Sequence, residues 1–221
     1  MEIIKFLIDF VLHLDVHLAE IIAQAGIWTY AILFAVIFME TGLVVTPFLP
    51  GDSLLFAAGS LVALDGSPLK IVPLWLLLFA AAVIGDTVNY EIGKFIGPKA
   101  FSANSRLLKK EYLDRTHAFY VKHGGITIFL ARFIPIIRTF APFVAGIGKM
   151  PYRHFISYNF FGGMVWTALF TFVGYFFGNL SFVKENFSLV IIAIIVISVI
   201  PAVIEVIKSR KKPAQSADLP E

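Results

Sequence analysis

One stretch of this chain, ETGLVVTPFLPGDSLLFAAG at residues 40–59, carries two carboxylates and two prolines between strongly apolar runs. The run before it, residues 27–39, has 13 residues, and the run that follows its Pro-Gly corner, residues 53–64, has 12. As helices, at about 1.5 Å per residue, each run covers only roughly 20 Å, whereas the hydrocarbon core of a bilayer is about 30 Å thick. These lengths predict a helical hairpin that enters the membrane and returns to the side from which it came.

The composition predicts an integral membrane protein. Hydrophobic residues make up 58% of the 221 residues and charged residues 15%, whereas a soluble chain carries about 25% charged residues. The positive charges cluster at the ends of apolar segments, as the positive-inside rule expects, so the basic balance does not indicate nucleic acid. One membrane domain, residues 1–210, accounts for nearly the whole chain. We expect residues 211–221 to be a disordered cytoplasmic tail.

Residues 3–25 are predicted to form an amphipathic helix, and the sequence leaves open whether it lies along the membrane or lines a cavity. Its two histidines have i,i+4 spacing, but no clear third ligand accompanies them, so we expect no metal site. Its polar stripe consists of Asp9, His13, His17, Glu20 and Gln24.

Three further segments, residues 71–97, 155–178 and 187–207, are long and apolar enough to be transmembrane helices. Residues 126–148 form a second interrupted segment. There PIIRTFAP, residues 135–142, separates two apolar arms that are again too short to cross. The sequence therefore predicts an all-α membrane protein with two re-entrant hairpins and a C-terminal transmembrane helix.

The distribution of positive charge supports a second returning hairpin. If residues 126–148 return, the basic segments at 94–122, 149–153 and 208–212 share one side, which then holds 13 Lys and Arg residues. A full crossing would separate the C-terminal cluster from the basic segment 94–122, in which we also expect a second amphipathic helix. The positive-inside rule then makes the chain multi-pass with its C-terminus in the cytoplasm.

The order of elements occurs twice. Each copy has an amphipathic helix, a glycine, a proline-broken hairpin ending in Ala-Gly, and a transmembrane helix ending in GxxxG. The Ala-Gly pairs end at Gly59 and Gly146, and the GxxxG motifs begin at Gly93 and Gly174. Because the two hairpins open from opposite sides, the copies form an inverted repeat, an arrangement typical of secondary transporters.

The first hairpin contributes two acids, Glu40 and Asp52, and the second contributes two bases, Arg132 and Arg138. A charge left alone at a helix centre costs about 2.5–3.5 kcal/mol, so the four must pair, hold a ligand or contact water. Arginine offers a planar fork suited to phosphate oxygens, and carboxylates in a poorly hydrated site can take up protons. The alternative is a structural cluster of ion pairs that clamps the hairpins together.

Other residues are secondary candidates. Asp86, Tyr90 and Glu91 lie toward the predicted cytosolic end of residues 71–97, where solvated anchoring is as good an interpretation as a role in the site. The three tryptophans, Trp28, Trp75 and Trp166, are interpreted as interfacial or packing residues. The residues expected to break the hairpins are Pro47, Pro50, Gly51, Pro135 and Pro142.

The two motifs ETGLVVTPFLPGDSLLFAAG and ARFIPIIRTFAPFVAG, residues 40–59 and 131–146, resemble those of the bacterial DedA family. The resemblance covers about residues 1–210. It implies an inner-membrane protein of the VTT or SNARE-associated class, with facing re-entrant hairpins. It also implies that Glu40, Asp52, Arg132 and Arg138 are the family's essential positions, and none of the four departs from the pattern.

Members of the family are linked to flipping of undecaprenyl phosphate or phospholipids and to dependence on the proton motive force. We therefore expect a proton-coupled transporter of a polyprenyl phosphate. The alternatives are an energy-independent phospholipid scramblase and an envelope-integrity factor that moves no lipid. No nucleophile–base pair or phosphate-binding glycine loop indicates an enzyme, and no cofactor is expected. The expected partners are a membrane lipid and protons, and the oligomeric state is left open.

Overall fold

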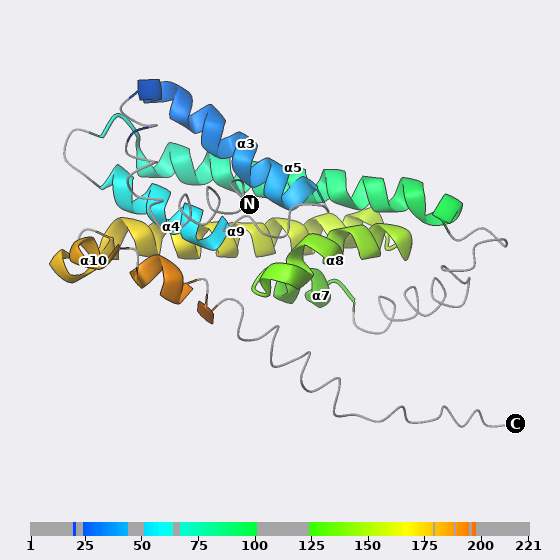
Figure 1. The fold of residues 1–221 in the computed structure, drawn as a ribbon. Coiled ribbons are helices and arrows are strands. Elements are labelled where there is room, and N and C mark those ends of the chain that lie inside the picture. Colours follow the sequence, from blue (N-terminus) through cyan, green and yellow to red (C-terminus); the bar gives the residue numbers. More distant parts are fainter. Residues whose placement is uncertain are drawn as a thin grey trace, which may run out of the picture.

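The computed structural model describes residues 20, 24–43, 51–63, 67–100, 124–178, 180–187, 189–194 and 196–197. Within these ranges the chain is nearly all helix and contains no strand (Figure 1). The prediction of an all-α protein is therefore confirmed for the part of the chain described. Most of the predicted helix at 3–25, the breakers Pro47 and Pro50, most of the basic segment 94–122 and the tail 211–221 lie outside these ranges.

Two long helices form the centre of the molecule. Helix α5, Ile71–Ala100, has 30 residues and helix α9, Tyr152–Phe177, has 26. They lie side by side and run in opposite directions (Figure 1). The stretches Ile71–Ile96 and Tyr152–Phe177 are long and apolar enough to cross a membrane, as their sequences predict.

Four shorter helices surround them: α3 is Thr29–Gly42, α4 is Gly51–Val62, α7 is Ile126–Ala131 and α8 is Pro135–Ile147. The longest, α3, has 14 residues and spans roughly 21 Å at about 1.5 Å per residue. A 3-10 turn, Gly26–Trp28, precedes α3, and a short helix α10, Ser181–Glu185, follows α9.

The first pair of short helices turns back on itself. The backbone N–H of Lys70, just before α5, donates to the hydroxyl of Tyr30 at 2.7 Å, and Tyr30 lies in the first turn of α3. Helix α4 ends at Val62, only eight residues before Lys70. The start of α3 and the end of α4 therefore lie at the same end of the molecule.

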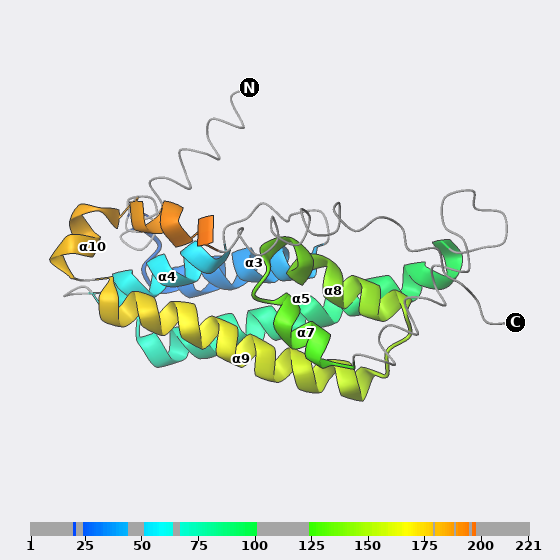
Figure 2. The same cartoon turned by 90° about the horizontal axis from the view of Figure 1, so that it is seen from below.

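Each hairpin places one arm on each long helix. In the first, α3 packs on α5 and α4 packs on α9; in the second, α7 packs on α9 and α8 packs on α5. The two hairpins cover opposite halves of the long pair (Figures 1 and 2). The first arm thus packs on α5 in the first hairpin and on α9 in the second, and the second arm does the reverse. Each long helix therefore contacts one arm of each hairpin.

Glycine allows the closest of these contacts. Helix α4 crosses α9 at Gly59 and Gly174, and helix α8 crosses α5 at Gly146 and Gly93. A Cβ atom on any of the four would overlap a backbone carbonyl oxygen of the facing helix. The GxxxG motif that begins at Gly93 therefore lies at a close helix crossing, as such motifs typically do. The Ala-Gly end of each hairpin packs against the GxxxG helix of the other copy.

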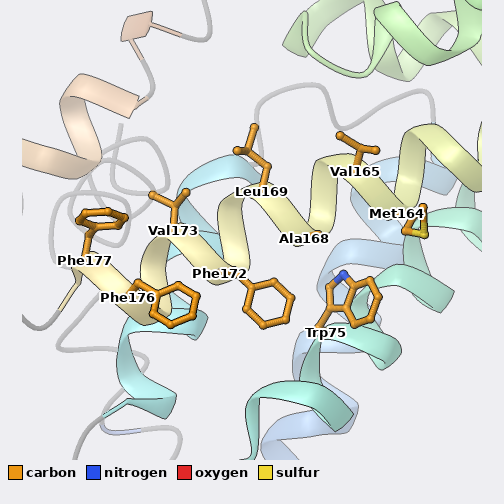
Figure 3. A pocket seen from close by; sticks show the side chains of 9 residues that line it. All are labelled: Trp75, Met164, Val165, Ala168, Leu169, Phe172, Val173, Phe176 and Phe177. Atoms are coloured by element: carbon orange, nitrogen blue, oxygen red, sulfur yellow. The ribbon is translucent and has the colours of Figure 1, made fainter.

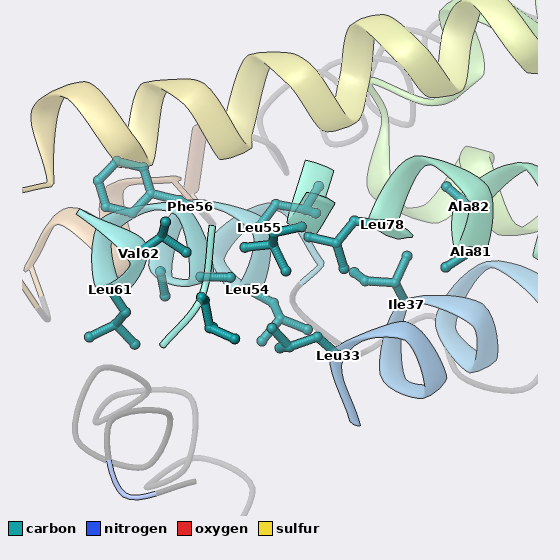
Figure 4. Packing of buried hydrophobic residues seen from close by; sticks show 14 of the residues in the cluster. Leu33, Ile37, Leu54, Leu55, Phe56, Leu61, Val62, Leu78, Ala81 and Ala82 are labelled. Carbon is teal, nitrogen blue, oxygen red and sulfur yellow. The ribbon is translucent and has the colours of Figure 1, made fainter. Parts of the chain in front are cut away.

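Apolar side chains fill the space between the first hairpin and α5 (Figure 4). Leu33, Ile37, Leu55 and Leu78 are at most 1% exposed there. Large apolar side chains also cover much of the outer surface; on α9, Phe176 is 66% exposed. A water-soluble protein avoids large continuous apolar surfaces, so this outer face fits a lipid surrounding.

The second hairpin breaks at a different place from the one predicted. Helix α7 ends at Ala131, and α8 begins at Pro135, where a proline in the first turn costs no helical hydrogen bond. Pro142 lies inside α8 and does not break it. A proline within a helix removes one N–H donor and can kink or break the helix, but α8 continues past Pro142 to Ile147.

Candidate functional site

Five charged side chains are buried in the described part of the chain, and they gather where the two hairpins meet the long helices. None of them is more than 7% exposed. Two arginines come from the second hairpin, two acids from the first, and one acid from α5. The five are Glu40, Asp52, Asp86, Arg132 and Arg138.

The first cluster joins the hairpins directly. Arg138, in α8, donates from Nη1 to Asp52 Oδ1 at 2.5 Å and from Nη2 to Glu40 Oε1. Glu40 lies in the last turn of α3, and Asp52 lies in the first turn of α4. Because the N-terminus of a helix carries a partial positive charge, Asp52 is favourably placed there even before it pairs. One guanidinium thus contacts a carboxylate from each arm of the first hairpin.

Gly51 explains how the two acids come so close. Its backbone N–H donates to Glu40 Oε1 at 3.1 Å, and a Cβ on Gly51 would overlap the Glu40 carboxylate. A side chain at this position would push the end of α3 away from the start of α4. The residue predicted to break the hairpin is therefore also in contact with the site.

The second cluster surrounds Arg132, which lies in the break between α7 and α8. Its Nη2 donates to Asp86 Oδ2 at 2.5 Å, to Asn159 Oδ1 and, at 3.5 Å, to the Ala82 carbonyl. Asn159 is held in turn by donating from Nδ2 to the Val83 carbonyl at 3.1 Å. Arg132 is thus paired with α5 and α9, and its ion-pair partner is Asp86 and neither Glu40 nor Asp52.

Trp166 of α9 lies between the two clusters. Its Nε1 donates to Asp52 Oδ1 at 2.8 Å, and its ring is 5.0 Å from Arg138 Cζ and 5.9 Å from Arg132 Cζ. It is 1% exposed and belongs to the buried core, so of the two interpretations, interfacial or packing, this tryptophan fits packing. A cation over an indole face is attracted by the ring quadrupole, and Trp166 therefore supports both guanidiniums.

Asn89 fixes the backbone around the first cluster. Its Nδ2 donates to the carbonyl of Thr41 at 3.0 Å and to the carbonyl of Thr139 at 2.8 Å. These residues follow Glu40 and Arg138 directly in the sequence. One amide on α5 thus holds together the backbone segments that carry the opposite charges.

The site retains unused hydrogen-bonding groups. Among the described residues no hydrogen-bond partner is found for Glu40 Oε2, Asn89 Oδ1, Arg132 Nε or Arg138 Nε, although all four atoms are buried. Counting every group as ionised, the Arg138 cluster carries one excess negative charge and the Arg132 cluster is neutral. Buried polar atoms without partners are costly, so the site is suited to accept a further ligand.

The remaining sequence candidates lie in different surroundings. Asp86, for which solvated anchoring was an equal alternative, is buried and paired, because α8 and the break before it cover the middle of α5. Glu91 is exposed and pairs with Lys94 at 3.4 Å. Tyr90 is buried but donates to the Met150 carbonyl at 2.5 Å, apart from the charged clusters.

An apolar groove of roughly 610 Å³ runs along the outer face of α9 and is closed on one side by Trp75 of α5 (Figure 3). Its lining contains no charged side chain. Trp166, which contacts both charged clusters, is buried and does not line the groove. Nor do three side chains of the metal-binding types His, Cys, Asp and Glu come together anywhere in the described ranges.

Comparison with known proteins agrees with the motifs. Residues 49–176 match the VTT domain. The chain is 56% identical to the protein DedA of Escherichia coli K12 over 98% of its own length and all of that protein. It is 42% identical to a membrane protein of Mycobacterium tuberculosis over 86% of this chain and 87% of the other. It is 32% identical to the inner membrane protein YghB of E. coli K12 over 80% of this chain and 78% of that protein. No solved structure matches.

Proposed function

Because this chain belongs to the DedA family of VTT-domain membrane proteins, we propose that it is a proton-coupled lipid transporter that moves a polyprenyl phosphate, with undecaprenyl phosphate the leading candidate. The observation that carries this proposal is the buried set of five charges between two short helical hairpins. Charges inside a membrane protein typically mark a substrate or ion pathway.

The architecture proposed for transport is an inverted repeat of two re-entrant hairpins. The exchanged packing supports it, since the Ala-Gly end of each hairpin crosses the GxxxG helix of the other copy. A two-fold relation in the membrane plane would produce this exchange. In transporters built from such repeats, the substrate binds near the midplane and one repeat moves against the other.

The arginines are suited to the lipid head group. A guanidinium forms strong, charge-assisted hydrogen bonds with phosphate oxygens, and the unpartnered Nε atoms of Arg132 and Arg138 provide donors for them. The apolar tail would remain in the surrounding lipid, which the exposed apolar surface of α9 allows.

The acids are suited to carry the proton. Glu40 and Asp52 share Arg138, so the three groups carry one excess negative charge when all of them are ionised. Burial disfavours an uncompensated charge, so the cluster has a reason to bind one proton. Protonation would loosen the hold of the acids on Arg138 and let the two hairpins separate.

The proposed location is the bacterial inner membrane, with a multi-pass chain and a cytoplasmic C-terminus. The name of the relative YghB, an inner membrane protein, supports the location, and two helices long enough to cross support the multi-pass topology.

The test is a head-group-resolved flipping assay with purified protein in proteoliposomes. We expect polyprenyl phosphate to move when a proton gradient is present and to stop when the gradient is collapsed. Arg132→Lys, which keeps the charge but loses the fork, should impair transport, whereas Arg153→Lys at an exposed position of α9 should not.

Three results would count against the proposal. Transport that ignores the gradient would identify an energy-independent scramblase. Folded protein that moves no lipid would favour a structural or envelope-integrity role, in which the charges only hold the fold. Normal transport by Arg132→Lys would argue against recognition of phosphate by that guanidinium.

A further inference from the structure

The two buried arginines are not equally engaged. Arg138 donates from both terminal nitrogens to two different carboxylates. Arg132 has one carboxylate partner, and all its hydrogen bonds to described residues leave from Nη2. Its Nε, like that of Arg138, has no partner within the described ranges, so the two arginines differ in their carboxylate partners and not at Nε. Nε and Nη2 form one side of the guanidinium fork, the side that binds an anion through two parallel hydrogen bonds.

The proposed function offers both arginines to the head group; we propose that, of the two, Arg132 takes the phosphate, and that Asp86 occupies its guanidinium until the phosphate arrives. The inference rests on the proposed function, because it names where in that site the head group binds. In the absence of phosphate, the Asp86 carboxylate binds Arg132 in place of the ligand. Asn159 remains beside Arg132 as a neutral partner in both states.

Charge balance favours Arg132 over Arg138. A phosphate monoester carries about −1.5 to −2 charges near neutral pH. At Arg138 it would join two carboxylates around one cation, in a buried place that already has an excess negative charge. At Arg132 it would meet a single carboxylate and an amide. The amide can be rotated to offer its N–H groups to an anion, which a carboxylate cannot do.

Arg132 packs directly against small residues of α9. Its side chain lies across Gly162 and Gly163 of α9. A Cβ on Gly162 would be 3.1 Å from Arg132 Cδ, and a Cβ on Gly163 would be 3.4 Å from Nη2. A larger residue at Gly162 would crowd the Arg132 side chain, so this glycine allows the guanidinium to lie against the backbone of α9.

An exchange of partners at Arg132 would also move the fold. Asp86 belongs to α5, and Arg132 lies in the break of the second hairpin. When the phosphate replaces Asp86, the ion pair that ties this break to α5 is lost. Head-group binding would then loosen the second hairpin from α5, while Arg138 still joins the second hairpin to the first.

The test measures binding of geranyl phosphate, a short prenyl phosphate, to detergent-purified full-length protein by calorimetry. We expect Asp86→Asn to bind geranyl phosphate about tenfold more tightly than the wild type, because the Asp86 carboxylate no longer competes for Arg132. Asn159→Asp, which adds a second carboxylate to Arg132, should weaken binding about tenfold. Arg132→Lys should lose about tenfold or more, and Arg138→Lys should change the affinity less than about threefold.

Matched controls separate the possible origins of the signal. Glu185→Gln, at an exposed acid of α10, should leave the affinity unchanged. Geraniol lacks the phosphate and should not bind. Inorganic phosphate tests the source of the anion: if it binds as tightly as geranyl phosphate, with the same response to Asp86→Asn, the site recognises the free anion and the exchange at Arg132 still holds.

The outcomes distinguish this inference from the proposed function. If the wild type binds but Arg138→Lys loses as much affinity as Arg132→Lys, or Asp86→Asn binds no more tightly, the assignment to Arg132 is wrong and phosphate transport still stands. If neither the wild type nor any variant binds geranyl phosphate, both fail. Should Asp86→Asn not fold, the direction of the Asn159→Asp effect decides: tighter or equal binding overturns the inference.

Discussion

The two hairpins of this protein pack alike and are charged oppositely. Each places one arm on α5 and one on α9, and each crosses a long helix at a pair of glycines. The first, however, carries two buried acids and the second two buried arginines. The packing is thus duplicated, whereas the charges are complementary.

This difference shows that helix packing and the charged site place different requirements on the sequence. Close helix crossings require small residues in any copy, so both hairpins keep glycine there. Buried charges are tolerated only with partners of opposite sign. A second acidic hairpin would therefore have made the site unstable. The exception is Arg132, whose partner Asp86 lies on a long helix and not on the first hairpin.

The largest expected effect is on the cluster that joins the hairpins. Arg138→Gln would leave Glu40 and Asp52 buried without a cation, and should destabilise the protein by about 3–5 kcal/mol. Arg132→Gln should cost less, because a single carboxylate loses its partner. Thermal unfolding in detergent measures both, with Arg153→Gln as the exposed control. An equal or larger loss of stability for Arg132→Gln would contradict the view that Arg138 holds more of the buried negative charge than Arg132 does.

A smaller effect is expected where the hairpins are alike. Gly59→Leu and Gly146→Leu each place a side chain against a backbone carbonyl of the facing helix. Each should destabilise the fold by about 3 kcal/mol, within the range for overpacking, and by similar amounts. Val165→Leu, on the exposed face of α9, should have little effect. If one of the glycine variants were stable and the other were not, the two crossings would not be equivalent.

Trp166 gives an intermediate prediction. Trp166→Phe keeps an aromatic ring near Arg138 but loses the N–H that donates to Asp52. Hydrogen bonds to charged groups contribute about 1.5–3 kcal/mol, so we expect a loss of about 1.5 kcal/mol in unfolding experiments. Trp75→Phe is the matched control, because Trp75 Nε1 has no partner in the described part of the chain. Equal losses for the two variants would contradict a specific role of the Trp166 N–H.

The smallest effect concerns an acid outside the site. Glu91 and Lys94 are each about half exposed, and exposed ion pairs contribute about 0–1 kcal/mol. Glu91→Gln should therefore change neither stability nor transport measurably, whereas Asp86→Asn on the same helix should change both. Loss of transport in folded Glu91→Gln would extend the site toward that end of α5.

Much of the fold follows from segment lengths and patterns. The two spans and the short arms of the hairpins are predicted from uninterrupted apolar length, and the close packing of Gly93 follows from the GxxxG spacing. The inverted repeat and the re-entrance of the hairpins remain predictions, because they concern a membrane that is not part of the structure.

The site was harder to predict, because its partners come from distant segments. Asp86 lies near the predicted cytosolic end of residues 71–97, and no local pattern indicates that the break before α8 covers it. Asn159 lies in the polar sequence YRHFISYN, which looks like a helix end at the membrane surface. Trp166 has no charged neighbours in sequence, which indicates an interfacial or packing residue and gives no sign of its contacts with the charged clusters. The four charges predicted from the two hairpins are all buried together, and their transport roles remain proposals.

Double-mutant cycles on stability test the division of charges most directly. The free energy of unfolding in detergent would be measured for variants that neutralise these charges singly and in pairs. The charges are those of Arg132, Arg138, Glu40 and Asp86. We expect coupling of about 2 kcal/mol or more between Arg138 and Glu40 and between Arg132 and Asp86, and below about 0.5 kcal/mol between Arg132 and Glu40. Strong coupling of Arg132 to Glu40, with none to Asp86, would contradict this division of charges.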